Sequence, residues 1–543
     1  MRTELVTTLK RQATELLSEL ERDRQPILIT QHGVPTAYLV DVLEREGGRS
    51  WDLTSSEGSM IFYKSLAATV IALLLIALPA AAADDAYDVV ILNGRVMDPQ
   101  SGLDAARNVG VRAGRIAAIS TEAMQGRRTI DAKGLVVAPG FIDLHEHGQK
   151  PENYRFQAHD GVTTSLELEA GTADVAGWYA EREGKSLVNF GVSVGHIPSR
   201  MKVMKDPGTW LPTGDAAHRA ATAAELEQID QRIEAGLKQG ALAVGMGINY
   251  TAGAAREEVL DVFRVAARHG APVHVHLRYA GDKAPETGRA ALEEVLTAAG
   301  ETKAPLHVVH VTSMGLRDTP QLLAMIRAAK ARGTDVTTEC YPYVAGSTGL
   351  ESALFDPGWQ ERMRIGYGDL QWVKTGERLT AATFERYRKE GGQVVIFMIP
   401  ENIVRLAVAD PMVMIASDGM PSAGASVHPR GQGTFSRVLG KYVREEKALD
   451  LMTALRKMTL MPAQRLEQRA AAFSTKGRIE PGADADITIF DANRVSDAAT
   501  FEKPLQYSDG IRFVLVNGVA VVSDGKLVDG VFPGRPARAR PVE

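Results

Sequence analysis

The middle of the chain alternates short apolar runs with stretches whose apolar residues have helical spacing. Strands that alternate with helices are typical of a parallel sheet, and eight such units close into a (β/α)8 TIM-type barrel. We therefore predict an α/β fold whose barrel covers residues 140–469. The predicted strands are Gly161–Glu169, Leu187–Gly195, Ala241–Met246, Pro272–Leu277, Leu306–Val311, Asp335–Thr338, Val394–Met398 and Met412–Ala416.

Shorter strand-and-turn patterns flank this region on both sides. Before it, the apolar run Tyr87–Leu92 leads into the turn Asn93-Gly94 and a second strand. After it, Asp486–Phe490 and Val514–Gly518 have the same character. We predict that residues 84–139 and 470–543 meet in one small β-sandwich domain.

Residues 1–59 are predicted to form a short N-terminal α+β extension. Leu9–Leu20 has helical apolar spacing, and Pro26–Thr30 and Thr36–Val40 are predicted strands on either side of a turn. The stretch PILITQHGVPTAYLV resembles the N-terminal half of Phd/YefM-type antitoxins, which bind operator DNA as dimers and mask a toxin. We expect no catalytic role for this extension.

Residues 60–83 have the features of a secretory signal peptide. Lys64 precedes the apolar run Leu66–Leu78, and small residues follow it up to Ala83. Because such a peptide acts at an N-terminus, we expect the functional chain to start at Met60 and to be periplasmic or secreted. Two alternatives stay open: a membrane anchor through residues 66–83, and a buried apolar helix.

The composition of the chain limits its possible binding partners and the residue types that could hold a metal ion. The formal net charge of -5 argues against nucleic acid as a partner of the main part of the chain, after residue 83. Cys340 is the only cysteine of the chain, which excludes an intramolecular disulfide and a cysteine-rich zinc site. A bound metal ion must therefore be held by histidines and carboxylates.

His145 and His147 follow the apolar run VVAPGFID. Residues i and i+2 of a strand point to the same face, so two imidazoles at this spacing can bind one ion. His276, His310 and Asp418 each end another predicted strand, and the strand ends of a barrel meet at one face. Four strand ends that all supply ligand-type side chains predict a metal centre.

Two further histidines lie beside these candidates. His274 shares the strand face of His276, so packing behind the ligands is its expected role. His307 is expected to point away from the barrel interior.

The chain from Tyr87 to Arg538 is similar to the amidohydrolase superfamily, in particular to its N-acyl-D-amino-acid deacylase branch. The similar runs, in chain order, are NGRVMDPQSG, APGFIDLHEH, GVTT, VGHIPSR, HVHLR, CYPYVAGSTGL, IASDGMPS, HPRGQGTFSRVLG and GADADITIFD. The resemblance implies a TIM-type barrel beside a β-sandwich, with one or two divalent metal ions. Zinc suits histidine and carboxylate ligands best, and manganese, cobalt and iron stay open. The implied metal-site residues are His145, His147, His276, His310 and Asp418.

One departure concerns an anionic ligand. D-aminoacylases carry a cysteine ligand where this chain has Ala170, and the run ALAVGMGINY has no lysine that could be carbamylated. An anionic ligand is still expected, since it offsets the charge of the ions and can bridge two of them. Glu169 is the first choice, and Glu167, on the same strand face, is the second.

By the same resemblance, Tyr341, Ser347 and Arg430 hold the substrate carboxylate, which needs a cation and hydrogen-bond donors. Family members often carry a lysine two residues after the His310 position, where this chain has Thr312. Arg278 is our candidate for the missing cation.

The implied reaction is hydrolysis of an N-acyl-D-amino acid by metal-activated water, with Asp418 as general base and then acid. The expected partner is thus a small-molecule N-acyl amino acid or a related amide. The same fold and metal centre could instead act on a cyclic amide, a dipeptide or an amide-linked toxin. A third hypothesis is a DNA-binding antitoxin fusion, but the signal peptide argues against it. Whether the chain forms a homo-oligomer stays open.

Overall fold

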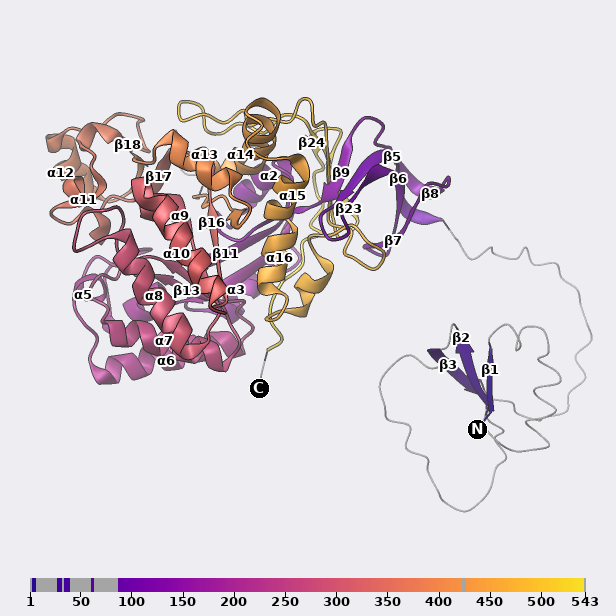
Figure 1. Ribbon diagram of the computed structural model, residues 1–543, viewed down its shortest axis with the longest axis horizontal. Helices are drawn as coiled ribbons and strands as arrows, with labels where there is room; N and C mark the ends of the chain where they lie inside the picture. The colour runs from indigo at the N-terminus through magenta and orange to yellow at the C-terminus, as the bar shows by residue number, and fades with distance from the viewer. Residues whose placement is uncertain are drawn as a thin grey trace, which may run out of the picture. The chain divides into compact units, whose positions relative to one another are not determined.

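Eight parallel strands form a nearly closed barrel in the middle of the chain, as the alternating pattern predicted (Figure 1). In the computed structural model these strands are β10 (Phe141–Asp143), β11 (Val162–Thr172), β12 (Asn189–Gly195), β13 (Val244–Gly247), β14 (Val273–His276), β15 (Leu306–Val308), β16 (Val336–Cys340) and β20 (Val413–Ile415). Each strand pairs with the one before it, and β16 pairs directly with β20. Parallel strands are covered on both faces, which explains why their sequences are near-continuous apolar runs.

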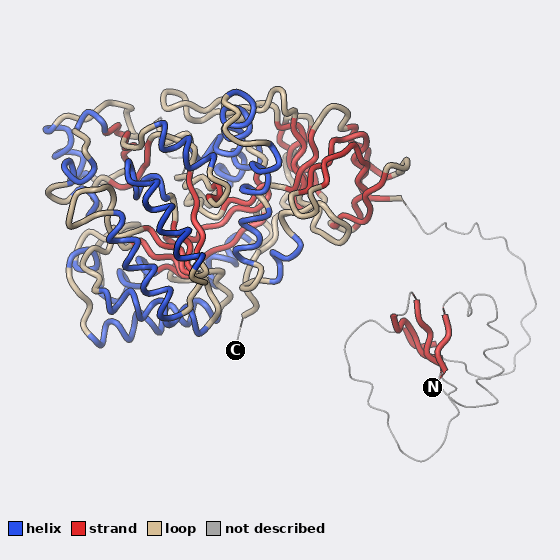
Figure 2. The backbone as a smooth tube through the Cα atoms, viewed as in Figure 1, coloured by secondary structure: helices blue, strands red, loops and turns tan. Residues whose placement is uncertain are grey.

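Helices surround this sheet (Figure 2). Helix α7 shows why: Val259, Val262, Phe263 and Ala266 are buried and lie three or four residues apart, so one face of the helix is apolar. Among the helices of the described part of the chain, none combines the length and the apolar character needed to cross a membrane. The helices are α2 (Pro151–His159), α3 (Val175–Arg182), α4 (His196–Met204), α5 (Asp215–His218), α6 (Ala223–Lys238), α7 (Arg256–Arg268), α8 (Gly288–Thr302), α9 (Val311–Gly315), α10 (Thr319–Ala331), α13 (Glu401–Ala409), α14 (Arg430–Arg437), α15 (Leu451–Met458) and α16 (Leu460–Leu466).

One predicted barrel strand lies outside the barrel. Val394–Met398 corresponds to β19 (Gln393–Phe397), the central strand of an antiparallel sheet with β17 (Ala345–Gly349) and β18 (Leu370–Trp372). The prediction was wrong because the middle of β19 is buried and therefore apolar, like a barrel strand. The first place in the barrel belongs to β10 instead.

This sheet belongs to an insertion between β16 and β20 that also contains α11 (Trp359–Met363) and α12 (Ala381–Glu390). Leu370, Trp372 and Phe384 contribute to an apolar core of its own. Figure 1 shows the insertion at the end of the barrel unit opposite to the strands of the flanks.

The two flanks of the barrel meet in one nine-stranded sheet, which confirms a β domain shared by both flanks. These strands are joined in a single sheet, whereas a sandwich predicts two. The junction is the antiparallel pair of β9 and β21. Val96, Val109, Ile489 and Leu515 belong to its apolar core. The strands are β5 (Tyr87–Asp98), β6 (Leu103–Arg112), β7 (Arg115–Ser120), β8 (Gly126–Asp131), β9 (Val136–Pro139), β21 (Ile487–Phe490), β22 (Ile511–Val516), β23 (Val519–Ser523) and β24 (Lys526–Leu527).

The first 84 residues form a separate unit. The two predicted strands are present as β2 (Ile27–Gln31) and β3 (Val34–Leu39), which pair antiparallel. The predicted helix over Leu9–Leu20 and the apolar run Leu66–Leu78 lie outside the described residues. The structure describes residues 2–5, 27–31, 34–39, 60–62, 86–421 and 426–541; β1 (Arg2–Leu5) and β4 (Met60–Phe62) complete the first unit's sheet.

Candidate metal centre

The segments after β10 and β20 are joined by backbone hydrogen bonds. The N–H of Asp418 donates to the carbonyl of His145 at 2.7 Å, and the N–H of His147 donates to the carbonyl of Gly419 at 2.8 Å. A side chain at Gly419 would collide with Glu146, because an added Cβ would lie 1.9 Å from Glu146 Oε2. Three candidate ligands are thus positioned by the backbone that closes the barrel.

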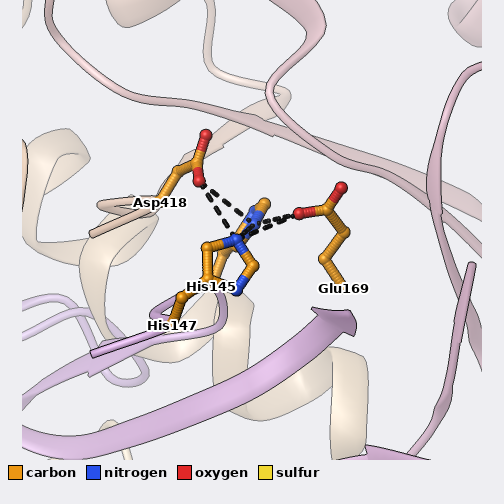
Figure 3. Close-up of side chains that lie close together, drawn as sticks. All are labelled: His145, His147, Glu169 and Asp418. Atoms are coloured by element: carbon orange, nitrogen blue, oxygen red, sulfur yellow. Dashed lines mark hydrogen bonds and ion pairs between the residues drawn. The ribbon is translucent and has the colours of Figure 1, made fainter. Parts of the chain in front are cut away.

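His145, His147, Glu169 and Asp418 point toward one another (Figure 3). The Nε2 atom of His145 lies 2.8 Å from Glu169 Oε2 and 3.3 Å from His147 Nε2. Asp418 Oδ1 lies 3.5 Å and 3.4 Å from the Nε2 atoms of His145 and His147. One donor atom of each residue lies within 4.8 Å of the others. We call these four residues the first ligand group; nitrogen and carboxylate donors that converge in this way fit a divalent metal ion.

Glu169 also belongs to a second ligand group with His276 and His310, whose donor atoms lie within 4.8 Å of one another. Its Oε1 atom lies 2.7 Å from His276 Nδ1 and 3.9 Å from His310 Nε2. Glu169 therefore presents one oxygen to each group. The structure places it where a carboxylate could bridge two ions.

The charges around the first ligand group favour a cation. Burial alone would lower the pKa of His145, but the charges of Asp418 and Glu169 raise this pKa well above its usual value. Burial likewise opposes ionisation of Asp418, yet Arg430 and His145 lower its pKa to about 2. The ionised carboxylates thus stabilise positive charge near the imidazole nitrogens. A bound metal ion can supply this positive charge.

Two more carboxylates lie behind the histidines of the first ligand group. Glu167 Oε2 lies 2.6 Å from His147 Nδ1, and Glu339 Oε1 lies 2.7 Å from His145 Nδ1. Glu167, the second-choice anionic ligand, thus contacts the far side of His147 and takes no place in either ligand group. Such partners fix the orientation of a ligating imidazole.

The ligand groups face a cavity whose wall includes Tyr341, Ser347 and Arg430. Arg430 Nη1 lies 2.8 Å from Asp418 Oδ2, and the guanidinium carbon lies 4.6 Å from the centre of the Tyr341 ring. Asp160 accepts hydrogen bonds from the N–H groups of Phe435 and Ser436, which anchors α14, the helix that begins at Arg430. The rest of the wall is mainly apolar: Ala170, Ile197, Trp210, Leu211, Tyr250, Ala280, Met314, Leu354, Met363, Ile396 and Met398.

Arg278 does not take part in this wall. Its guanidinium forms a two-point ion pair with Glu294, at 2.9 Å and 2.7 Å, and donates to the carbonyls of Ala252 and Ala254. The expectation that Arg278 supplies a substrate-binding cation does not fit this arrangement. A carboxylate on α8 and two loop carbonyls already engage its donors, and neither contact could be inferred from sequence spacing.

His307 was also assigned the wrong side of its strand. Its Nε2 atom lies 3.0 Å from Glu339 Oε2, and its ring centre lies 4.5 Å from that of His274. The side chain therefore faces the barrel interior, behind the metal site. Glu339 itself was missed, although a carboxylate at the end of a predicted buried strand is the signal that identified Asp418.

Trp210 is a second residue that the sequence did not reveal. Its ring centre lies 5.5 Å from that of His147, and it comes from the loop after α4. Asp206 holds this loop by accepting hydrogen bonds from four backbone N–H groups, those of Gly208, Thr213, Gly214 and Ala216. No sequence pattern marks a loop residue that covers a distant site.

Three relatives resemble this chain over most of their length. The N-acyl-D-glutamate deacylase of Alcaligenes xylosoxydans xylosoxydans is 32% identical over 499 residues, which cover 84% of this chain and 95% of the relative. A crystal structure of N-acyl-D-glutamate deacylase from Bordetella bronchiseptica, complexed with zinc and a phosphonate that mimics the tetrahedral intermediate, is 30% identical with a TM-score of 0.72. It covers 84% of this chain and all of its own.

The third relative is a D-aminoacylase structure that concerns a binuclear metal centre, with one-metal activation and second-metal attenuation. It has 30% identity and a TM-score of 0.72, and it covers 83% of this chain and 100% of its own. The model of the amidohydrolase family matches residues 128–194 and 198–522. By the extent of this match and the identity to its relatives, the chain belongs to the amidohydrolase family.

Proposed function

We propose that this chain is a metal-dependent deacylase that removes the acyl group from N-acyl-D-amino acids. The observation that carries the proposal is the pair of ligand groups that share Glu169, with Asp418 between the histidines and Arg430. The relatives named above, which act on N-acyl-D-glutamate or are D-aminoacylases, support this substrate class.

One or two divalent ions, with zinc as the first candidate, would be held by the two ligand groups. The donor set of histidine nitrogens and carboxylate oxygens fits zinc, which is also the ion named for the Bordetella bronchiseptica structure. When bound, such an ion polarises the scissile carbonyl and makes water a stronger acid.

Asp418 is the proposed general base and acid. Its low pKa leaves the carboxylate ionised at neutral pH, as a base requires. It accepts a proton from the water that attacks the carbonyl carbon, and it returns this proton to the amide nitrogen as the carbon–nitrogen bond breaks. The products are the carboxylic acid and the free amino acid.

The substrate carboxylate would bind at Arg430, Tyr341 and Ser347. Within the described residues, Ser347 Oγ and Arg430 Nε are buried without a hydrogen-bond partner. Buried donors without partners are costly in free energy, and a bound carboxylate would remove this cost.

We further propose that the preferred side chain is apolar. Among the described residues that line the cavity, Arg430 is the only lysine or arginine, and the α-carboxylate of the substrate would occupy it. An acidic side chain would then lie against Met314, Met363 and Met398 without a cation. Desolvation of such an unpaired charge is strongly unfavourable.

The test is metal analysis of the full chain together with assays on N-acetyl-D-leucine, N-acetyl-L-leucine and N-acetyl-D-glutamate. We expect zinc-dependent hydrolysis that is fastest for the D-leucine derivative, and an Asp418→Asn variant that folds normally but loses about 10²–10⁴-fold in kcat. Equal rates on the D- and L-leucine derivatives would contradict the proposal. A faster reaction with N-acetyl-D-glutamate would contradict only the apolar side-chain preference.

The location of the enzyme and the nature of residues 1–59 stay predictions. We propose export by the segment 60–83, on the sequence pattern alone, with the antitoxin-like stretch as a separate upstream unit. N-terminal sequencing of the protein purified from its host tests this, since we expect the mature chain to start near Asp84. A cytoplasmic protein that retains residues 60–83 would contradict it.

A further inference from the structure

A line of hydrogen bonds runs from the first ligand group into the barrel interior. His145 Nδ1 lies 2.7 Å from Glu339 Oε1, and Glu339 Oε2 lies 3.0 Å from His307 Nε2. The line ends at Thr337, whose hydroxyl lies 2.7 Å from His307 Nδ1. His145, Glu339 and His307 are at most 1% exposed. These contacts connect β15 and β16 with a candidate metal ligand that follows β10.

The position of this line is unusual for a barrel core. The interior layers of such barrels are normally filled by branched apolar side chains, and a buried carboxylate is costly unless it is paired. Thr337 and Glu339 are two residues apart on β16, so both point inward, toward His307 on the neighbouring strand. Stability alone would favour apolar residues in the barrel interior. The presence of Glu339 there therefore points to a role in the adjacent metal centre.

The carboxylate of Glu339 also selects one tautomer of each neutral imidazole that it contacts. An ionised Glu339 accepts at both oxygens, so the proton of His145 lies on Nδ1 and that of His307 lies on Nε2. The hydroxyl of Thr337 lies 2.7 Å from His307 Nδ1 and 3.5 Å from the carbonyl oxygen of Leu306. A histidine that binds a metal ion is neutral, so a proton on Nδ1 leaves Nε2 of His145 free for the ion. This Nε2 atom lies 2.8 Å from Glu169 and 3.5 Å from Asp418.

We propose that Glu339 is a positioning residue of the metal centre: held by His307, its carboxylate fixes His145 as the tautomer whose Nε2 binds the ion of the first ligand group. The inference rests on the proposed metal centre but not on the identity of the substrate. Glu339 forms no hydrogen bond or ion pair with His276 or His310. Its influence should therefore reach one of the two metal positions and leave the other unchanged.

The experiment is a zinc titration of the metal-free full chain against a chromophoric competing chelator, without substrate. Glu339→Gln keeps the shape of the side chain but removes its charge, and its amide requires His307 to change tautomer. We expect about 10–100-fold weaker binding of one zinc ion and unchanged binding of the other, the usual cost of losing such a partner. Binding of both ions at wild-type affinity would overturn the proposal.

Two further variants separate this effect from a general disturbance of the core. Thr338→Val is the matched control, because Thr338 is buried beside Glu339 on β16. Within the described residues, its hydroxyl makes one hydrogen bond, to the carbonyl of Val308. We expect wild-type zinc binding from this variant. A loss of zinc affinity equal to that of Glu339→Gln would overturn the proposal.

His307→Gln leaves His145 and Glu339 in place but perturbs the second contact of Glu339. His307→Gln should lower the affinity for the same zinc ion by a smaller factor than Glu339→Gln does. If Glu339→Gln does not fold, an unchanged zinc affinity of His307→Gln overturns the proposal. A wild-type chain that binds no zinc would instead contradict the metal centre itself.

Discussion

The two ligand groups share Glu169 but differ in what lies behind their histidines. In the first group both histidines have a buried carboxylate partner: His145 bonds Glu339, and His147 bonds Glu167. Each of these rings is held between the ligand cluster on one side and a negative charge on the other.

The histidines of the second ligand group have weaker hydrogen-bond partners behind them. His310 Nδ1 lies 2.9 Å from the hydroxyl of Ser313, a neutral partner. Within the described residues, the only hydrogen bond of the His276 ring is the one to Glu169 itself. A carboxylate partner fixes an imidazole and strengthens it as a donor, whereas a hydroxyl mainly orients it. The comparison teaches that the second group depends more strongly on Glu169, while the first is also supported from behind.

The largest effect is expected from Glu169→Ala. This variant removes an oxygen from both ligand groups, so both zinc ions should be lost or bound far more weakly, and hydrolysis should fall below detection. Zinc content of the purified variant, measured by elemental analysis beside wild type, checks this. Full zinc content with wild-type activity would show that Glu169 is not the shared ligand.

A smaller effect, limited to the first ligand group, is expected from Glu167→Gln. The charge behind His147 is lost while the shape is kept, so one zinc ion should bind about tenfold or more weakly, in the range typical of such partners. Zinc titration against a competing chelator measures this, with Thr338→Val as the reference variant. A loss at both positions would contradict the separation of the two groups.

The smallest effect is expected from Ser313→Ala. A neutral hydrogen bond contributes about 0.5–1.5 kcal/mol, so the zinc ion of the second ligand group should bind roughly two- to tenfold more weakly. The same titration applies. A loss as large as that of Glu167→Gln would break the comparison, because a hydroxyl would then support its histidine as strongly as a carboxylate.

The sequence predicted the barrel and the β domain well because both depend on local patterns. Buried parallel strands are apolar along their whole length, and β12 and β14 show this directly. The same rule failed for β19, since a strand buried in an insertion has the same pattern as one buried in a barrel. Only strand pairing, which is not local, separates the two cases.

The residues of the candidate site also fall into those that a local pattern predicts and those that depend on contacts between distant parts of the chain. His145, His276 and Asp418 stand at strand ends, so a rule about barrels found them. Arg278 also stands at a strand end, but its partner Glu294 lies on a helix and could not be foreseen. Trp210 comes from a loop whose course is determined by Asp206, and no periodicity describes such a loop.

The closure of the barrel has a consequence for how this site tolerates change. The described residues of β10 and β20 share no continuous ladder, and their ends are joined by the bonds from Asp418 to His145 and from His147 to Gly419. Side chains of non-ligand residues also join the two segments: the N–H of Ser417 donates to Asp143 Oδ1 at 3.0 Å, and the hydroxyl of Ser417 donates to Glu146 Oε2 at 2.9 Å. The ligands His145, His147 and Asp418 enter the main-chain bonds through their backbone atoms, so a change of their side chains leaves those bonds in place. The ligand chemistry can therefore vary while Asp143, Glu146, Ser417 and Gly419 keep the barrel closed.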